Sequence, residues 1–278
     1  MSKHAVIVCS NAGLDYLKHP KDITIFRSKI HFGTESYDDF TEMDGQTFYD
    51  RIKANPDDIP KTSYVSIGYM LETFERLLKE GYQEALIIVI AKPLSGLHDA
   101  ILNLQSQTQL KLTVFDSKTL TYPESYMALT AHEMFEKGAG MPAVLEALSF
   151  IRDNHKIYFG VDTLLYLIKN GRLSKLQGTI GTFLKIKPIL SITSEGKVET
   201  LEKVRTAPKA LRRVVDLYLE DTKDKEVITF VAHANNDEVV KEIADMIQTV
   251  HPKRKVISVY LTPVVGAHAG PKAYGLGY

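Results

Sequence analysis

The chain has 278 residues, of which 44% are hydrophobic and 24% charged, and its 34 basic side chains balance its 34 acidic ones. This length leaves room for two ordinary domains, and the balanced charge argues against a nucleic-acid partner. The longest apolar runs, ALIIVIA and AVIVC, are too short to cross a bilayer, and the start MSKH shows no signal-peptide pattern. A single cysteine, Cys9, excludes an internal disulfide framework, and nine histidines without H-x-x-x-H spacing give metal binding little support. We therefore expect a cytoplasmic protein with no metal and no transmembrane segment.

In the first half of the chain, short apolar strands alternate with helical patterns. The run 85–91 is apolar throughout, as in a strand covered on both faces, and Gly81 marks the end of the amphipathic pattern before it. Such alternation predicts a parallel sheet between two layers of helices, a three-layer α/β/α arrangement. The predicted strands are 4–10, 22–26, 85–91 and 111–117, and the predicted helices are 47–54, 64–80, one from about 95, and 124–137.

The second half of the chain has a different pattern of predicted strands and helices. Residues 187–204 contain two strands joined by Ser194-Glu195-Gly196, which is a hairpin signal. A hairpin followed by separated strands predicts a mixed, largely antiparallel sheet with helices on one face, a two-layer α/β domain. Predicted strands are 156–161, 226–232 and 255–262 besides the hairpin, and predicted helices are 162–170, about 175–184, 206–221 and 236–249. We place the boundary in the polar stretch 150–156, giving domains 1–153 and 154–278.

Two hydroxyl-bearing clusters stand at predicted helix starts: Thr62 with Ser63, and Ser95 with Gly96. Helix N-termini leave backbone N–H groups unpaired, so two of them at one sheet edge would bind a carboxylate or phosphate without a cationic side chain. Simple helix capping is the alternative, because serine and threonine are common N-caps. Gly96 favours a close approach of backbone to a ligand, since glycine at a helix start otherwise costs stability.

The C-terminal run PVVGAHAGPKAYGLGY places His268 among small residues and packs poorly as helix or strand. A Ser95–His268 dyad, oriented by Asp116 at a strand end, is one catalytic alternative. Pro93 replaces the first glycine that a nucleophile elbow would need, and neither common nucleotide-binding glycine motif occurs.

Several ordered motifs resemble one protein family, the DegV family of bacterial fatty-acid-binding proteins, over essentially the full length. The most specific is LLYLIKNGRLSKLQGTIGTFLKIKPIL at 164–190, similar to the family block L-x-Y-L-K-x-G-G-R-I-S…I-K-P-I-L. The other matching segments are KTSYVS at 61–66, PLSGL at 93–97, VFDSKT at 114–119, GKVETLEKVRT at 196–206 and VVGAHAGPKAYGL at 264–276.

The resemblance implies a two-domain, non-catalytic protein that holds one long-chain fatty acid, with its acyl chain buried and its carboxylate at the domain interface. By position, the carboxylate contacts would be Thr62, Ser63, Ser95, Gly96 and His268. The resemblance also implies a partner, a separate fatty-acid kinase that receives the acyl group. Arg205 would lie at the position that docks this kinase. Transient contact with a membrane is compatible with the same role. No cofactor is implied beyond the fatty acid itself.

The chain departs from the family pattern at four places. Cys9-Ser10 stands for Asp-Ser, Tyr64-Val65 for Gln-Pro, Leu97 for threonine and Lys272 for glycine. These changes would either retune the polar site or accompany loss of the usual ligand. Two further hypotheses therefore stay open: an enzyme, either a hydrolase or a small-molecule phosphotransferase, and a ligand-free interaction protein on the same fold.

Overall fold

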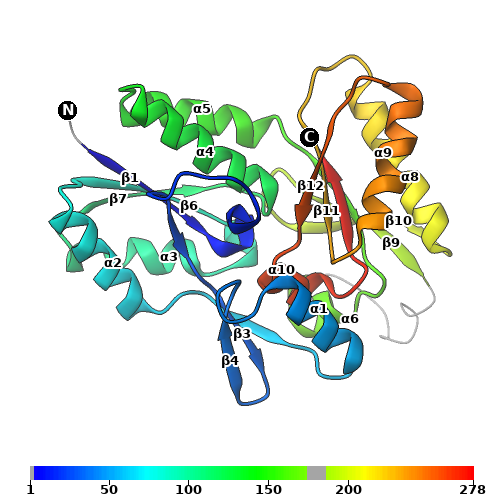
Figure 1. Cartoon of the computed structure of the whole chain (residues 1–278), viewed down its shortest axis with the longest axis horizontal. Helices are drawn as coiled ribbons and strands as arrows, with labels where there is room; N and C mark the ends of the chain where they lie inside the picture. The colour runs from blue at the N-terminus through cyan, green and yellow to red at the C-terminus, as the bar shows by residue number, and fades with distance from the viewer. Residues whose placement is uncertain (1–2, 174–185) are drawn as a thin grey trace.

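A four-stranded parallel sheet forms the centre of the first half of the chain. In the computed structural model, which describes residues 3–173 and 186–278, its order is β2-β1-β6-β7 (Figure 1). All six residues of β6 are buried, as the unbroken apolar run predicts. The strands are β1 (His4–Cys9), β2 (Thr24–Phe26), β6 (Glu84–Val89) and β7 (Lys111–Asp116).

Helices cover both faces of this sheet. Met70, Phe74 and Ile101, from α2 (Ile67–Lys79) and α3 (Leu97–Leu102), pack on one face. Met127, Val144 and Leu148, from α4 (Tyr122–Glu136) and α5 (Met141–Asp153), pack on the other (Figure 1). The predicted three-layer arrangement is confirmed. Short 3-10 helices also occur, at Ser10–Ala12, Leu14–Tyr16, Lys92–Leu94 and Gln105–Gln107.

The second half builds a six-stranded sheet in the order β10-β9-β8-β13-β11-β12. Only β11 and β12 pair in parallel, so the mixed, largely antiparallel prediction is confirmed. Helices α8 (Ala207–Thr222) and α9 (Asp237–Val250) lie side by side on one face (Figure 1). The strands are β8 (Ile157–Gly160), β9 (Lys187–Ile192), β10 (Val198–Val204), β11 (Thr229–His233), β12 (Val256–Tyr260) and β13 (Tyr274–Gly277). The helix expected at 175–184 lies outside the described residues.

A small antiparallel sheet corrects one prediction. Thr62 and Ser63 do not start a helix: they lie on β5 (Lys61–Ser63), which pairs with β3 (Lys29–Phe32), itself paired with β4 (Glu35–Asp38). Helix α2 begins later, at Ile67, where the Ser66 hydroxyl accepts the N–H of Tyr69 at 3.2 Å. The helical periodicity is real, but cross-strand pairing with β3, distant in sequence, decides the conformation of residues 61–63.

The C-terminal run is also more regular than predicted. It forms α10 (Pro263–Ala269) and then β13, an interior strand of the second sheet. Proline near the start of α10 suits a first helical turn, and Gly270, at φ 78°, ends it. A side chain at Gly277 would overlap the ring of Phe230, so glycine lets β13 fit between its neighbours.

The face of the second sheet opposite α8 and α9 packs against elements of the first half. Phe48 and Ile52 of α1 (Gly45–Ala54), with Ile30 of β3, share one buried cluster with Phe230 and Val265. Helix α6 (Leu165–Lys169) packs there too. The division into domains 1–153 and 154–278 stays a prediction, with α5 ending at Asp153 and β8 beginning at Ile157. Across the described ranges, we find no helix with the length and apolar character needed to span a membrane.

Candidate functional site

A cavity of about 330 Å³ is lined by residues of both halves of the chain. Most of its wall is apolar, including side chains from β8, β9 and α10. Representative apolar lining residues are Leu120, Phe159, Leu167, Ile192, Leu261 and Val265. A cavity with this wall suits an extended apolar ligand.

The five residues expected to contact a carboxylate all line this cavity: Thr62, Ser63, Ser95, Gly96 and His268. Thr62 and His268 are in direct contact, with 2.8 Å between Oγ1 and Nε2. The first comes from β5 and the second from α10, so the contact joins segments 206 residues apart. The structure thus gathers the predicted residues, while their contact with a carboxylate stays a prediction.

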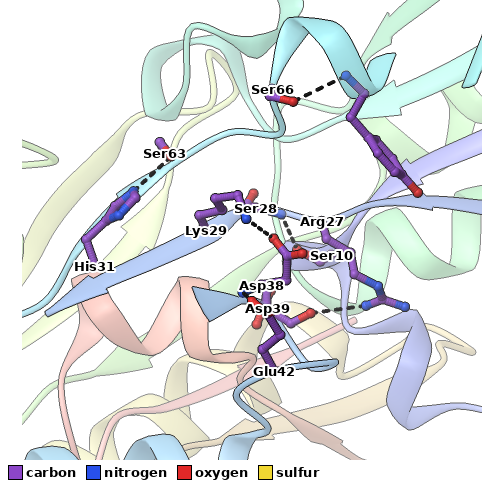
Figure 2. Close-up of polar contacts among 11 residues, drawn as sticks. Ser10, Arg27, Ser28, Lys29, His31, Asp38, Asp39, Glu42, Ser63 and Ser66 are labelled. Carbon is purple, nitrogen blue, oxygen red and sulfur yellow. Dashed lines mark hydrogen bonds and ion pairs between the residues drawn. The ribbon is translucent and has the colours of Figure 1, made fainter. Parts of the chain in front are cut away.

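Each serine of the group already has a partner. The Ser95 hydroxyl accepts the N–H of Leu97 at 3.3 Å, so it stabilises the turn that leads into the short helix α3 as well as lining the cavity. The Ser63 hydroxyl lies 2.9 Å from Nε2 of His31, as Figure 2 shows. A hydroxyl has one hydrogen and two lone pairs, so the hydroxyl of each serine can still form a hydrogen bond with a ligand. Gly96 precedes α3, and among the described residues a side chain there would meet only the Tyr64 ring, at 3.9 Å.

His268 is electrically neutral at physiological pH. Burial lowers its pKa to about 4, and the positive charge of Arg172 adds to the effect. Its Nδ1 is buried and has no hydrogen-bond partner in the described part of the chain. When the Thr62 hydroxyl donates to Nε2, Nδ1 carries the ring's single hydrogen and can donate it to a ligand.

Arg172 is a cavity residue that sequence reasoning missed. It follows α6, lines the cavity and donates from Nε to the carbonyl of Leu94 at 3.1 Å, beside Ser95. The cavity lining therefore includes a cationic side chain that the expected anion site lacked, while anion binding itself stays a prediction. The available signal was the NGRLS stretch at 170–174, which follows the helix predicted at 162–170.

Residues 3–173 and 186–278 do not form the assembled Ser95–His268–Asp116 arrangement that the catalytic alternative needs. His268 bonds Thr62 rather than Ser95. Asp116 accepts the backbone N–H groups of Lys92 at 3.2 Å and Lys118 at 3.0 Å, which fixes the loop around it. It orients no imidazole in the described structure.

Two other features lie outside the cavity lining. Arg205 is exposed directly after β10. Asp22, His132 and Glu136 form a group that could offer three ligand atoms to a metal ion, with both carboxylates exposed. None of these three residues lines the cavity.

Comparison with known proteins decides the family. The model of the DegV family, whose description reads uncharacterised protein, matches residues 3–278. This chain belongs to the DegV family. A DegV domain-containing protein of Clostridium acetobutylicum is 30% identical, over 99% of this chain and 98% of its own.

Solved DegV structures share the whole fold. A fatty acid binding DegV family protein from Streptococcus agalactiae superposes with a TM-score of 0.90 at 25% identity, covering 100% of this chain and 98% of its own. DegV from Bacillus subtilis, described as a fatty acid binding protein, gives 0.87 at 28% identity, covering 100% and 99%.

Three of the departures from the DegV motifs lie away from the cavity wall. Cys9 and Leu97 are buried in the core between the parallel sheet and α2 and α3, and neither lines the cavity. Lys272 is exposed in a left-handed turn at φ 59° and also lies outside the lining. Of the residues at the departure sites, Tyr64 alone reaches the wall. These departures therefore change the core and a surface turn more than the polar end.

Proposed function

We propose that this DegV family member binds one long-chain fatty acid in the cavity, with the carboxylate at the Thr62–His268 end. One observation carries the proposal: the polar residues from both halves converge on a cavity whose wall is otherwise mostly apolar. The two similar structures described as fatty acid binding support the ligand class.

Burial of the acyl chain would supply the affinity. About 14 methylenes at roughly 0.8 kcal/mol each give about 11 kcal/mol before the costs of association and ordering. The polar end would mainly prevent the penalty of a buried, unpaired carboxylate. Long-range attraction is unnecessary for such a ligand, which agrees with a formal net charge of zero.

We assign the chain a carrier role, with any acyl phosphorylation carried out by a separate fatty-acid kinase. This part rests on the resemblance to the family, as does the docking role of Arg205. Exposure of Arg205 outside the cavity is compatible with contact to a partner while the ligand stays bound. Cytoplasmic location likewise stays a prediction.

Mass spectrometry of an organic extract from the purified protein tests the ligand class. We expect one C14–C20 fatty acid per chain. Ser95→Ala should weaken fatty-acid binding about tenfold or more, because it removes a hydrogen bond to a charged group. The matched control is Ser66→Ala, which removes a hydroxyl that also accepts a backbone N–H near a helix start but does not line the cavity.

The extract also discriminates between the alternatives. Extracts without a stoichiometric acid, together with no uptake of added fatty acid, would contradict the proposal and favour the enzyme or ligand-free hypotheses. Equal retention of the acid by the parent, Ser95→Ala and Ser66→Ala proteins would remove Ser95 from the site.

A further inference from the structure

A histidine and two carboxylates meet on the surface of the first half of the chain, outside the cavity lining. His132 and Glu136 lie one turn apart on α4, and Asp22 lies in the turn that leads into β2. Nε2 of His132 is 3.0 Å from both carboxylate oxygens of Asp22. One nitrogen or oxygen atom from each of the three residues lies within 4.8 Å of the other two. Two segments 110 residues apart in sequence therefore bring three metal-ligating side chains together.

The spacing of the two residues on α4 suits metal binding by a helix. Residues four apart lie on the same face, so the imidazole of His132 and the carboxylate of Glu136 can reach one ion. A search for two histidines in H-x-x-x-H spacing does not detect this H-x-x-x-E pair, and Asp22 joins it only in the folded chain. The lack of paired histidines therefore does not exclude a metal site.

The distances suit a small transition-metal ion. Zinc lies about 2.0 to 2.2 Å from a ligating histidine nitrogen or carboxylate oxygen, so two neighbouring ligands are about 3 to 3.5 Å apart. The 3.0 Å between His132 and Asp22 falls in this range. The carboxylate of Glu136 is exposed at the end of a flexible side chain, so it can close the remaining distance to an ion.

The negative charge of the group is not neutralised by a lysine or arginine in the described ranges. Asp22 forms its one ion pair there with His132, and Glu136 forms none. Lys137, next to Glu136 in sequence, pairs with Glu133 instead. With a neutral imidazole, the two carboxylates leave a charge that a divalent cation would balance.

We propose that Asp22, His132 and Glu136 bind one divalent ion of the zinc class, with water completing its coordination. The imidazole favours such an ion over Mg²⁺ and Ca²⁺, which prefer oxygen ligands. Nε2 of His132 would offer its lone pair to the ion, so the imidazole hydrogen would lie on Nδ1. The ion would tie the turn before β2, a three-residue strand at the edge of the parallel sheet, to α4.

A role without metal makes a different prediction. If the group only formed the hydrogen bond between His132 and Asp22, zinc would gain no affinity from the three side chains. Zinc would then leave the melting temperature of the protein unchanged, because only a ligand that binds the folded state stabilises it.

Isothermal titration calorimetry of the chelator-treated full chain with ZnCl₂ at pH 7.5 tests the site. The parent should bind one Zn²⁺ per chain, which excess MgCl₂ should not displace. His132→Ala should weaken binding about tenfold or more, because loss of even an outer partner of a metal ligand costs 10- to 100-fold. Glu136→Gln should also weaken it, and this change to an exposed side chain keeps the test valid where His132→Ala folds poorly. Zinc should raise the melting temperature of the parent but not of His132→Ala.

His98→Ala is the matched control. Nδ1 of His98 also lies close to a carboxylate, 2.9 Å from Oδ1 of Asp99, but Lys92 already pairs with that carboxylate at 2.9 Å. Among the described residues, no third metal ligand joins this pair. Its substitution should leave both zinc affinity and the rise in melting temperature unchanged.

The remaining outcomes would overturn the proposal. They are no zinc binding by the parent, equal binding by the parent, His132→Ala and Glu136→Gln, or displacement of zinc by MgCl₂. Because none of the three residues lines the cavity, these results would leave the proposed fatty-acid binding untouched.

Discussion

The carboxyl group of Asp39 is completely buried where β4 leads toward α1. Arg27 donates to the backbone carbonyl of Asp39 at 3.2 Å, and Figure 2 shows this contact. The Ser10 hydroxyl and the N–H of Val264 in α10 lower its pKa, but neither makes a well-formed hydrogen bond with the carboxyl oxygens. Burial outweighs them and raises the pKa of Asp39 to about 7.

This raised pKa makes folding stability pH-dependent. The folded protein keeps the Asp39 proton up to about pH 7, whereas the unfolded chain loses it near pH 4. The free energy of unfolding should therefore fall as pH rises between these values, by about 2 to 3 kcal/mol from pH 5 to pH 8. Asp39→Asn should remove this decline and be more stable than the parent at pH 8.

Chemical denaturation at pH 5 and pH 8 measures the effect. Because other groups also titrate in this range, the informative quantity is the difference between parent and Asp39→Asn at each pH. An identical difference at both values would show that Asp39 does not keep its proton in the folded state.

At the same scale, residue types and positions in the sequence located much of the candidate site. Ser95, Gly96 and His268 stand out through their flanking glycines and through the family motifs. Asp39 could not be found this way, because its importance comes from its complete burial. Complete burial is a property of the folded chain.

At the scale of elements, α10 positions His268 by packing closely on α1. An added Cβ at Gly266 would lie 2.5 Å from the Tyr49 hydroxyl and 2.7 Å from Cε1 of Phe48. Tyr49 in turn donates to the Leu261 carbonyl at 3.0 Å, just before α10. The small residues near the C-terminus therefore let this helix approach the first half of the chain.

Gly266→Ala should push α10 away from α1. We expect a loss of about 1 to 3 kcal/mol in the free energy of unfolding, typical of overpacking, together with weaker fatty-acid binding because His268 moves with the helix. Denaturation and displacement of a bound fluorescent fatty acid measure the two effects.

The matched control is Gly96→Ala, where the new methyl group meets the Tyr64 ring at 3.9 Å and no closer atom of the described residues. This protein should keep nearly the parent's stability and lose affinity only through crowding of the head group. If Gly266→Ala matched the parent in both measurements, the close packing of α10 on α1 would not position His268.

Predictions from local sequence patterns failed where pairing with a strand distant in sequence decides the secondary structure. Residues 61–63 precede an amphipathic helix and look like its start, yet β3 draws them into a sheet. The C-terminal run looks irregular because of its glycines, yet those glycines fit β13 between β8 and β11. In both cases the deciding partner lies far away in sequence.

At the scale of the whole molecule, the order and spacing of the predicted strands and helices indicated both sheets. Continuous apolar runs between helices indicate the parallel sheet, and the hairpin at 187–204 indicates the antiparallel one. The cavity could not be predicted, because residues that line a cavity and residues that fill a core have the same composition. Its position follows from how α1, β3 and α10 join the two halves.

A crystal structure of the protein with octadecanoic acid tests the central claim most directly. We predict the carboxylate within hydrogen-bonding distance of Ser95 and His268, with the acyl chain running along Phe159, Ile192 and Val265. A head group bound at the opposite end, or a fatty acid seated outside this cavity, would contradict the account.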